Sequence, residues 1–269
     1  MKYLNVPVLF IVALTAEFSA RAADDAEFLP IDLKPYSNQK LDDAFGPGLD
    51  ENNLKHLPKG ESVFEDCNFE IGEGLIQLGS TALKQTLTEK VEGIKVDRKL
   101  TKLHFLHATQ CGGGPNKSGD PWYVEDDTLV GEYRVNFSDR SAVIIPIAYG
   151  VDVRDWFFVE GEKEPSRSKV VWTGDNDYAH ANGARIRLYE TTWENPWPGK
   201  TVTSIDFSAK KNETPAAPFC VAITSEGPAR KMGARLFLKV HLGEQLFDRF
   251  PFASCRGHVN TFEYASLQQ

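Results

Sequence analysis

Residues 130–150, VGEYRVNFSDRSAVIIPIAYG, contain two apolar runs joined by a short polar turn. In the first run Tyr133, Val135 and Phe137 alternate with polar residues, which is typical of a strand with one buried face. The second run is apolar almost throughout, so we expect a central strand that is covered on both faces. SDRS at 138–141 predicts a hairpin turn, with Arg140 in a position where glycine would be the easier residue.

Similar short runs, rich in Val, Ile, Phe and Tyr and separated by Gly, Pro, Asn and Asp, follow one another along the chain. They lie at residues 69–79, 93–109, 169–174, 185–193, 201–209 and 218–224. Because helical periodicity is almost missing between them, the sequence predicts an all-β, antiparallel sandwich or barrel. The polar segment 30–68 is interpreted as a strand around Ile31 to Leu33 followed by a long connection. Residues 110–127 are predicted to form a long loop.

The first 22 residues predict a signal peptide cleaved after Ala22. Lys2 precedes an apolar run at 6–16, and small residues occupy the positions before the cleavage point. The alternative is a membrane anchor, but the run is well short of the roughly 20 residues that a membrane-spanning helix needs. We therefore expect an exported protein of the periplasm, cell envelope or extracellular space, with no transmembrane segment.

The composition predicts one folded domain, residues 23–226, followed by a basic tail. The chain is 41% hydrophobic and 25% charged, as expected of a globular protein. Its net charge of −8 is uneven: residues 1–22 carry +1 and residues 227–269 carry +3, which leaves −12 for the body. An acidic body argues against a nucleic-acid partner. The tail, 227–269, starts at a Gly-Pro break and is either an extra hairpin plus helix or a poorly ordered segment.

Several catalytic and metal motifs are missing or incomplete. CGGGPNKSGD lacks the glycines that a phosphate-binding loop needs, and no GxSxG or HExxH is present. His104 and His107 are three residues apart, which on a strand sends them to opposite faces, so we expect no shared metal ion. The four cysteines do not make a disulfide scaffold, and Cys220 in APFCVAI is interpreted as a small buried hydrophobe.

Aromatic residues beside polar partners are the candidate ligand-binding residues. An aromatic ring can cover the apolar face of a sugar while charged groups bind its hydroxyls. The alternative is that the tryptophans cap the core, with Arg154 paired to Asp152 or Asp155 as a clamp within the loop. The candidates lie in DPWYVEDD, VRDWFF and TTWENP: Trp122, Tyr123, Asp152, Arg154, Asp155, Trp156, Trp193 and Asn195.

Two weaker site hypotheses concern carboxylates. Asp175 and Asp177 in GDNDYA could hold a Ca²⁺ ion with help from loop carbonyls, although a solvated turn is the simpler interpretation. Acidic loops elsewhere could supply a pair of carboxylates about 5–10 Å apart across a cleft, as glycan hydrolysis requires. No other cofactor is expected.

Several segments together resemble a known family, in order over residues 28–226. They include GEGLIQLGS, VEGIKVDRKLTKLHFLHATQCGGGP, IPIAYGVDVRDWFF, VVWTGDND, RIRLYETTWENPWPGKTVTSIDFSAK and APFCVAIT. The chain is similar in these to the secreted jelly-roll modules of planctomycete-type bacteria, which resemble galactose-binding-like β-sandwiches of the carbohydrate-binding-module type. The resemblance implies a non-catalytic antiparallel jelly roll with any ligand in loops at one end, at residues 149–156 and 191–196, and in some members a structural Ca²⁺. Arg140 and the basic tail depart from the pattern.

Three functions follow as expectations. The first is an exported, non-catalytic module that binds a carbohydrate. The alternative is a structural or protein-interaction scaffold in the periplasm or cell envelope. The third is a glycan hydrolase that acts through two loop carboxylates.

Overall fold

Two antiparallel sheets and a separate hairpin form the part of the chain that the computed structural model describes, residues 26–46, 49–83, 87–113, 122–210 and 214–227. These residues belong to one unit of the chain, Asp24–Lys231. The all-β, antiparallel fold class is confirmed, whereas the jelly-roll connectivity stays a prediction. The expected signal peptide lies outside the described residues, as does the tail beyond Gly227.

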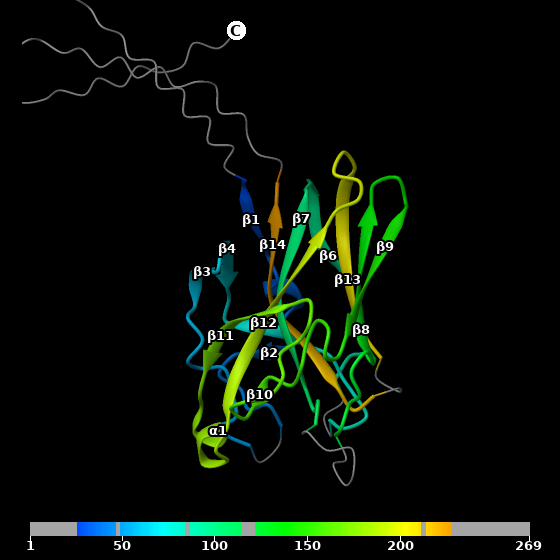
Figure 1. The fold of residues 1–269 in the computed structure, drawn as a ribbon. Coiled ribbons are helices and arrows are strands. Elements are labelled where there is room, and N and C mark those ends of the chain that lie inside the picture. The colour runs from blue at the N-terminus through cyan, green and yellow to red at the C-terminus, as the bar shows by residue number, and fades with distance from the viewer. Residues whose placement is uncertain (1–25, 47–48, 84–86, 114–121, 211–213, 228–269) are drawn as a thin grey trace, which may run out of the picture. The chain divides into compact units, whose positions relative to one another are not determined.

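The larger sheet has the order β10-β12-β7-β14-β5-β2, with β11 added on β12 and β1 on β14 (Figure 1). Its strands are β1 (Phe28–Ile31), β2 (Gln39–Lys40), β5 (Gly74–Gln77), β7 (Lys102–Gln110), β10 (Phe157–Phe158), β11 (Lys169–Gly174), β12 (Arg185–Glu194) and β14 (Ala217–Glu226). Each of these strand pairs is antiparallel.

The smaller sheet has the order β6-β13-β8-β9, and β3 pairs only with β4. The bounds are β3 (Gly60–Phe64), β4 (Cys67–Ile71), β6 (Lys90–Lys99), β8 (Leu129–Phe137), β9 (Ala142–Ala148) and β13 (Thr201–Ala209). The helical elements are a 3₁₀ turn, η1 (Lys34–Tyr36), and α1 (Asp177–Ala181). No described helix is long and apolar enough to cross a membrane.

Aromatic rings fill the space between the two sheets. Phe105 of β7 stacks on Tyr133 of β8 at 4.0 Å between ring centroids, and Tyr133 stacks on Phe207 of β13 at 4.7 Å. All three side chains are buried. The alternation of Tyr133, Val135 and Phe137 therefore places one face of β8 in the core, as the sequence predicts.

The larger sheet is buried on its second face as well. Phe219 of β14 packs on that face against Phe45 and Trp156, and Leu41 and Leu54 are buried too. The strand predicted near Ile31 is present as β1, but the rest of segment 30–68 is not a plain connection, because it contains β2 and β3 and supplies core side chains. Burial on both faces explains why nearly every residue of β7 and β14 is enclosed.

The hairpin of β8 and β9 is confirmed, but the position of β9 is not the predicted one. Arg140 has a φ of 70°, the left-handed conformation that favours glycine. However, β9 is an edge strand of the smaller sheet, and Ile144 is 43% exposed. Pro146 explains the difference, because a residue without an N–H is tolerated at a sheet edge and not in a central strand.

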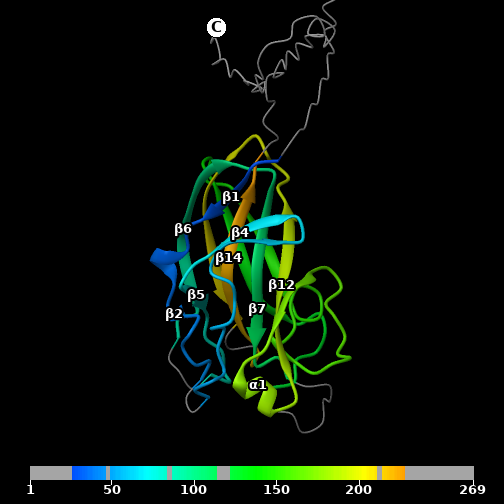
Figure 2. The same cartoon turned by 90° about the vertical axis from the view of Figure 1, so that its left-hand side faces the viewer.

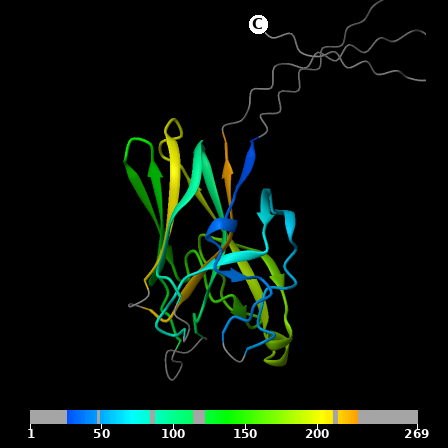
Figure 3. The ribbon, with the colours of Figure 1, turned by 180° about the vertical axis from the view of Figure 1, so that it is seen from behind.

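The β3–β4 hairpin lies on the face of the larger sheet that is turned away from β8 and β9. Figure 1 shows it on the opposite side of β14 from those strands, and Figure 2 shows β4 in front of β14. Figure 3 gives the same separation from behind. The hairpin thereby brings its turn and Cys67 over the strands that carry the site described next.

Candidate functional site

A pocket of about 510 Å³ lies between the β3–β4 hairpin and the larger sheet. Four of the residues that line it come from four different strands: Cys67 begins β4, His104 lies on β7, Glu190 lies on β12, and Glu226 ends β14. The first three side chains are buried, and Glu226 is partly buried. Potential ligand atoms from distant parts of the chain therefore meet in one place.

Sheet register explains this arrangement. His104 pairs with Thr192 across β7 and β12, and Glu190 lies two residues from Thr192, so all three point to one face. Lys102, two residues before His104, pairs with Glu226 on β14. The alternation of side chains along three neighbouring strands thus assembles a polar patch on one face of the sheet.

His107 points the other way, as its spacing from His104 predicts. Its Nδ1 lies 3.2 Å from the Tyr133 hydroxyl and its Nε2 2.8 Å from Thr191 Oγ1. Burial lowers the pKa of His107 to about 3, so the ring is neutral and belongs to the core. The prediction that the two histidines share no metal ion is consistent with these separate surroundings.

His104 lies between two carboxylates. Its Nδ1 is 2.9 Å from Glu190 Oε1, and its Nε2 is 3.2 Å from Glu226 Oε2. The Thr192 hydroxyl donates to Glu190 Oε1 over 3.3 Å and lies 3.2 Å from His104 Nδ1. Lys102 Nζ approaches Glu226 Oε2 at 3.1 Å. Both ring nitrogens are therefore held in fixed directions by carboxylates.

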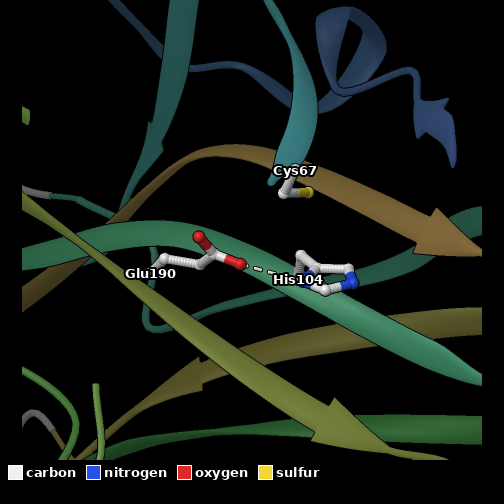
Figure 4. Close-up of side chains that lie close together, drawn as sticks. All are labelled: Cys67, His104 and Glu190. Carbon is white, nitrogen blue, oxygen red and sulfur yellow. Dashed lines mark hydrogen bonds and ion pairs between the residues drawn. The ribbon is translucent and has the colours of Figure 1, made fainter. Parts of the chain in front are cut away.

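Cys67 completes the group on the hairpin side. Figure 4 shows the Glu190 carboxylate directed at the His104 ring, with Cys67 above the ring in that view. The ligand atoms of Cys67, His104 and Glu190 all lie within 4.8 Å of one another. Burial, and secondarily the charges of Glu190 and Glu226, raise the pKa of the Cys67 thiol well above its ordinary value.

The raised thiol pKa distinguishes two kinds of chemistry. A nucleophilic cysteine needs a lowered pKa and a histidine that accepts its proton. Here both nitrogens of His104 face carboxylates, and Cys67 Sγ lies 3.9 Å from the Asn68 carbonyl oxygen. The surroundings oppose a free thiolate but suit a thiolate that is bound to a metal cation.

Trp156, the central predicted ligand residue, is a core residue. It is 2% exposed, stacks on Phe45 at 4.5 Å between centroids, and meets Phe219 edge-on. Its backbone N–H donates to the Thr109 carbonyl. Of the two interpretations for this ring, the structure supports the one in which it packs into the core.

The clamp interpretation named the wrong partners for Arg154. Its guanidinium donates to both carboxylate oxygens of Asp126, at 2.7 and 2.9 Å. Asp152 instead accepts two bonds from Arg167, at 2.7 and 2.8 Å. Asp155 accepts from the backbone N–H groups of Gly112 and Phe157. Ion pairs to residues outside the loop therefore hold it in place. The residue pattern of the loop alone could not identify these partners.

The remaining predicted ligand residues lie at two ends of the larger sheet. Trp193 pairs with Leu103 at the start of β7, whereas Thr109 at its other end bridges to Asp155. Six residues of extended strand separate these points by about 20 Å. The predicted residues therefore do not line one groove, and carbohydrate binding stays a prediction.

Local contacts account for most of these residues. Asn195 is buried, donates to the Leu100 carbonyl and accepts from the Trp197 N–H. Trp122 is 51% exposed and Tyr123 is partly buried, and both lie against Gly113 just beyond β7.

The calcium candidates Asp175 and Asp177 flank the start of α1. Asn176 between them caps this helix by accepting from the Ala179 N–H at 2.7 Å. Asp175 Oδ1 lies 3.9 Å from His56 Nδ1, and Asp177 also approaches a cation, Lys55. A calcium site needs further oxygen ligands around the ion. Each of these aspartates has a basic side chain as its neighbour instead.

Sequence reasoning missed the pocket as a unit. Spacing along the chain suggests only His107 as a second ligand beside His104. Cys67, Glu190 and Glu226 lie in separate segments, with no spacing typical of metal ligands. One signal was available: a polar side chain between buried apolar neighbours, as His104 is between Leu103 and Phe105, needs a buried partner. Its partner could not be named without the strand register.

Comparisons with known proteins give no further guide to this site. No protein-family model, no curated protein and no solved structure matches the chain. The resemblance to galactose-binding-like modules therefore stays a prediction.

The Asp155 carboxyl predicts a dependence of stability on pH. Burial raises its pKa to about 7, although the Phe157 and Gly112 N–H groups act in the opposite direction. The folded state then holds a proton between about pH 4 and 7 that the unfolded chain releases, so the free energy of unfolding falls as pH rises through this range. We expect the ionisation of Asp155 to lower the free energy of unfolding by about 2–4 kcal/mol between pH 4 and pH 7.

Urea unfolding of the wild type and Asp155→Asn at pH 5 and pH 7.5 measures this contribution. The variant loses a hydrogen-bond acceptor and is less stable at pH 5, but its stability should change much less between the two values. A parallel change in both proteins would show that Asp155 ionises normally.

Proposed function

We propose that this protein binds a divalent transition-metal ion, foremost Zn²⁺, through Cys67, His104 and Glu190. One observation carries the proposal: three buried donor atoms from three separate strands lie within 4.8 Å of one another beside a pocket. A thiol, an imidazole and a carboxylate that converge from separate strands are the ligand types that transition-metal ions take in proteins.

The donor set fits zinc in type and spacing. Zinc takes thiolate, imidazole and carboxylate ligands, and tetrahedral bonds of about 2.0–2.3 Å place the ligand atoms about 3.3–3.6 Å apart. His104 Nδ1 and Glu190 Oε1 are 2.9 Å apart, and the Cys67 sulfur is within 4.8 Å of both. Side-chain movements of about 1 Å therefore bring the three atoms to bonding positions.

The same donors argue against the hard cations. Ca²⁺ and Mg²⁺ are held by six or more oxygen ligands, whereas sulfur and nitrogen supply two of the three donors here. Thiolate and imidazole favour zinc and its neighbours among the transition metals. The site therefore differs from the calcium site that the sequence suggested at Asp175 and Asp177.

Glu226 contacts the ring nitrogen of His104 that is not the proposed ligand, which supports the metal site. Metal-binding histidines commonly donate their second N–H to a carboxylate, which fixes the ring and raises its basicity. Glu226 Oε2 lies 3.2 Å from Nε2, the nitrogen opposite the proposed ligand atom, and Lys102 holds that carboxylate in turn. The arrangement orients Nδ1 toward Cys67 and Glu190.

Equilibrium dialysis of the purified, chelator-treated chain against buffered Zn²⁺ tests the proposal. The expected result is one tightly bound zinc ion per chain, with Ca²⁺ and Mg²⁺ in excess failing to displace it. Absence of stoichiometric binding by a folded sample would overturn the proposal.

Glu226 supplies a graded prediction. Glu226→Ala removes the carboxylate that orients His104 and is expected to weaken zinc affinity by about 10–100-fold. Glu226→Gln keeps a hydrogen-bond acceptor and should lose less. Competition with a zinc-binding dye measures both affinities, and equal, unchanged affinities would show that Glu226 plays no part in the site.

A further inference from the structure

We infer that the metal centre is open and that its vacant coordination position binds a small oxyanion, a carboxylate or phosphate group, from the pocket. This inference rests on the proposed metal site and deepens it by naming a ligand class. It follows from the number of protein donors, from the surroundings of each ligand and from the charges on the pocket wall.

The protein supplies three ligands and no fourth within the described part of the chain. Glu226 binds the far nitrogen of His104, so it is directed away from an ion at Nδ1. The Thr192 hydroxyl lies 3.3 Å or less from both Glu190 Oε1 and His104 Nδ1, but it is a neutral group. Zinc held by three protein ligands keeps a position for an exogenous ligand, unlike a closed structural site.

The free position has room for a ligand. The three donor groups form part of the wall of the 510 Å³ pocket, and Thr192, beside the ligand atoms, is an exposed residue. A pocket of this volume accommodates a small organic molecule in addition to the ion. The centre is therefore accessible from the side of the pocket.

Two lysines favour an anion at that position. Lys169 is the direct cross-strand partner of Glu190, and Lys102 lies two residues from His104, so both share the face of the ligands. A bound Zn²⁺ is balanced by the Cys67 thiolate and the Glu190 carboxylate, and Lys102 is paired with Glu226, so the Lys169 ammonium is the group that attracts the incoming ligand.

Lys169 is available for this contact. Lys102 is partly exposed and pairs with Glu226, and Lys169 is 71% exposed with a loose 3.7 Å contact to Glu65 at the hairpin turn. Arg167 also lines the pocket and is anchored by Asp152. Glu65 and Asp66 are the acidic groups at the rim, and an oxyanion would replace Glu65 as the partner of Lys169.

Cobalt substitution tests the inference directly. Co²⁺ takes zinc sites, and its visible ligand-field bands change when a coordination position changes its occupant. The full chain is loaded with one equivalent of Co²⁺ and titrated with acetate or phosphate at constant ionic strength, with perchlorate as the weakly coordinating control. The expected result is a saturable spectral change with acetate, phosphate or both, and none with perchlorate.

The outcomes separate the two proposals. If the thiolate-to-cobalt charge-transfer band forms but the visible ligand-field bands do not change with either oxyanion, the open position is overturned and the metal site stands. Failure to form any cobalt spectrum would overturn both proposals. Acetate and phosphate are compared in separate titrations, which show whether the site prefers a carboxylate or a phosphate group.

Lysine variants test the role of the pocket wall. Lys169→Met should weaken oxyanion affinity by about threefold to fivefold, the effect of removing one exposed charge contact. Lys95→Met is the matched control, because Lys95 is exposed to a similar degree and lies on β6 of the other sheet. The cobalt spectrum recorded before anion addition shows that each variant is loaded. Equal affinities in Lys169→Met, Lys95→Met and the wild type would exclude the lysine contact and overturn the selection for oxyanions.

Discussion

Replacing His104 with alanine is expected to abolish stoichiometric zinc binding. His104 provides the central ligand atom, 2.9 Å from Glu190 Oε1, and its loss leaves a thiol and a carboxylate that cannot hold the ion alone. Equilibrium dialysis should give less than a tenth of the wild-type occupancy at a zinc concentration that saturates the wild type, about tenfold above its dissociation constant.

Cys67→Ser and Glu190→Gln extend this test. Each keeps the approximate shape of the side chain and removes a thiolate or a carboxylate, so each should weaken zinc binding without removing a large core residue. His56→Ala is the control, because its side chain is 53% exposed and lies near Asp175, away from the pocket. Wild-type zinc binding by folded His104→Ala and Cys67→Ser would contradict the assignment.

Zinc should also stabilise the fold. Cys67 belongs to the β3–β4 hairpin while His104 and Glu190 belong to the larger sheet, so a bound ion would connect two elements that share no strand pairing. At free zinc about 100 times the dissociation constant, binding adds about 2.7 kcal/mol to the free energy of unfolding. Thermal unfolding with and without a chelator measures this, and the variants of the three ligands should lose the difference, whereas His56→Ala should keep it.

Trp156→Ala is expected to lower the free energy of unfolding by about 3–5 kcal/mol, because it removes a fully buried ring and leaves a cavity. The ring is 2% exposed and packs on Phe45 and Phe219 beneath the N-terminal segment. Urea unfolding measures the change. A loss of this size is expected to exceed that of any single substitution at an exposed position.

Trp122→Ala is the matched comparison, since the Trp122 side chain is 51% exposed. It should cost much less stability than Trp156→Ala. If Trp156→Ala cost less than about 1 kcal/mol, the ring could not be part of a well-packed core.

The strands were predictable from local pattern, and their places in the sheets were not. Alternating Tyr133, Val135 and Phe137 identified a half-buried strand, and Arg140 marked the hairpin turn. The apolar run of β9 suggested a central strand, but Pro146 makes it an edge strand. Apolar content reports burial, whereas the order of strands depends on contacts between distant segments.

The second buried face of the larger sheet shows the same limit. Leu41, Phe45 and Leu54 stand singly among polar residues, so segment 30–68 showed no strand or helix periodicity. Phe45 nevertheless packs on Phe219 and Trp156, which helps to explain why the aromatic residue expected to face a ligand is enclosed. Isolated apolar side chains in loops give no periodic signal.

The candidate site depended on register across four strands and a hairpin. Lys169 opposite Glu190, Thr192 opposite His104 and Glu226 opposite Lys102 place six polar side chains on one face. None of these pairings follows from spacing along the chain. The polar His104 between apolar Leu103 and Phe105 was visible in the sequence, but its surroundings appear only once the sheet is assembled.

X-ray absorption spectroscopy at the zinc edge tests the metal site most directly. The zinc-loaded chain should show one sulfur at about 2.3 Å and the remaining nitrogen and oxygen neighbours at about 2.0–2.2 Å, with imidazole scattering that is lost in His104→Ala and a sulfur shell that is lost in Cys67→Ser. A zinc spectrum with oxygen neighbours alone, or one that neither substitution changes, would contradict a centre built from Cys67, His104 and Glu190.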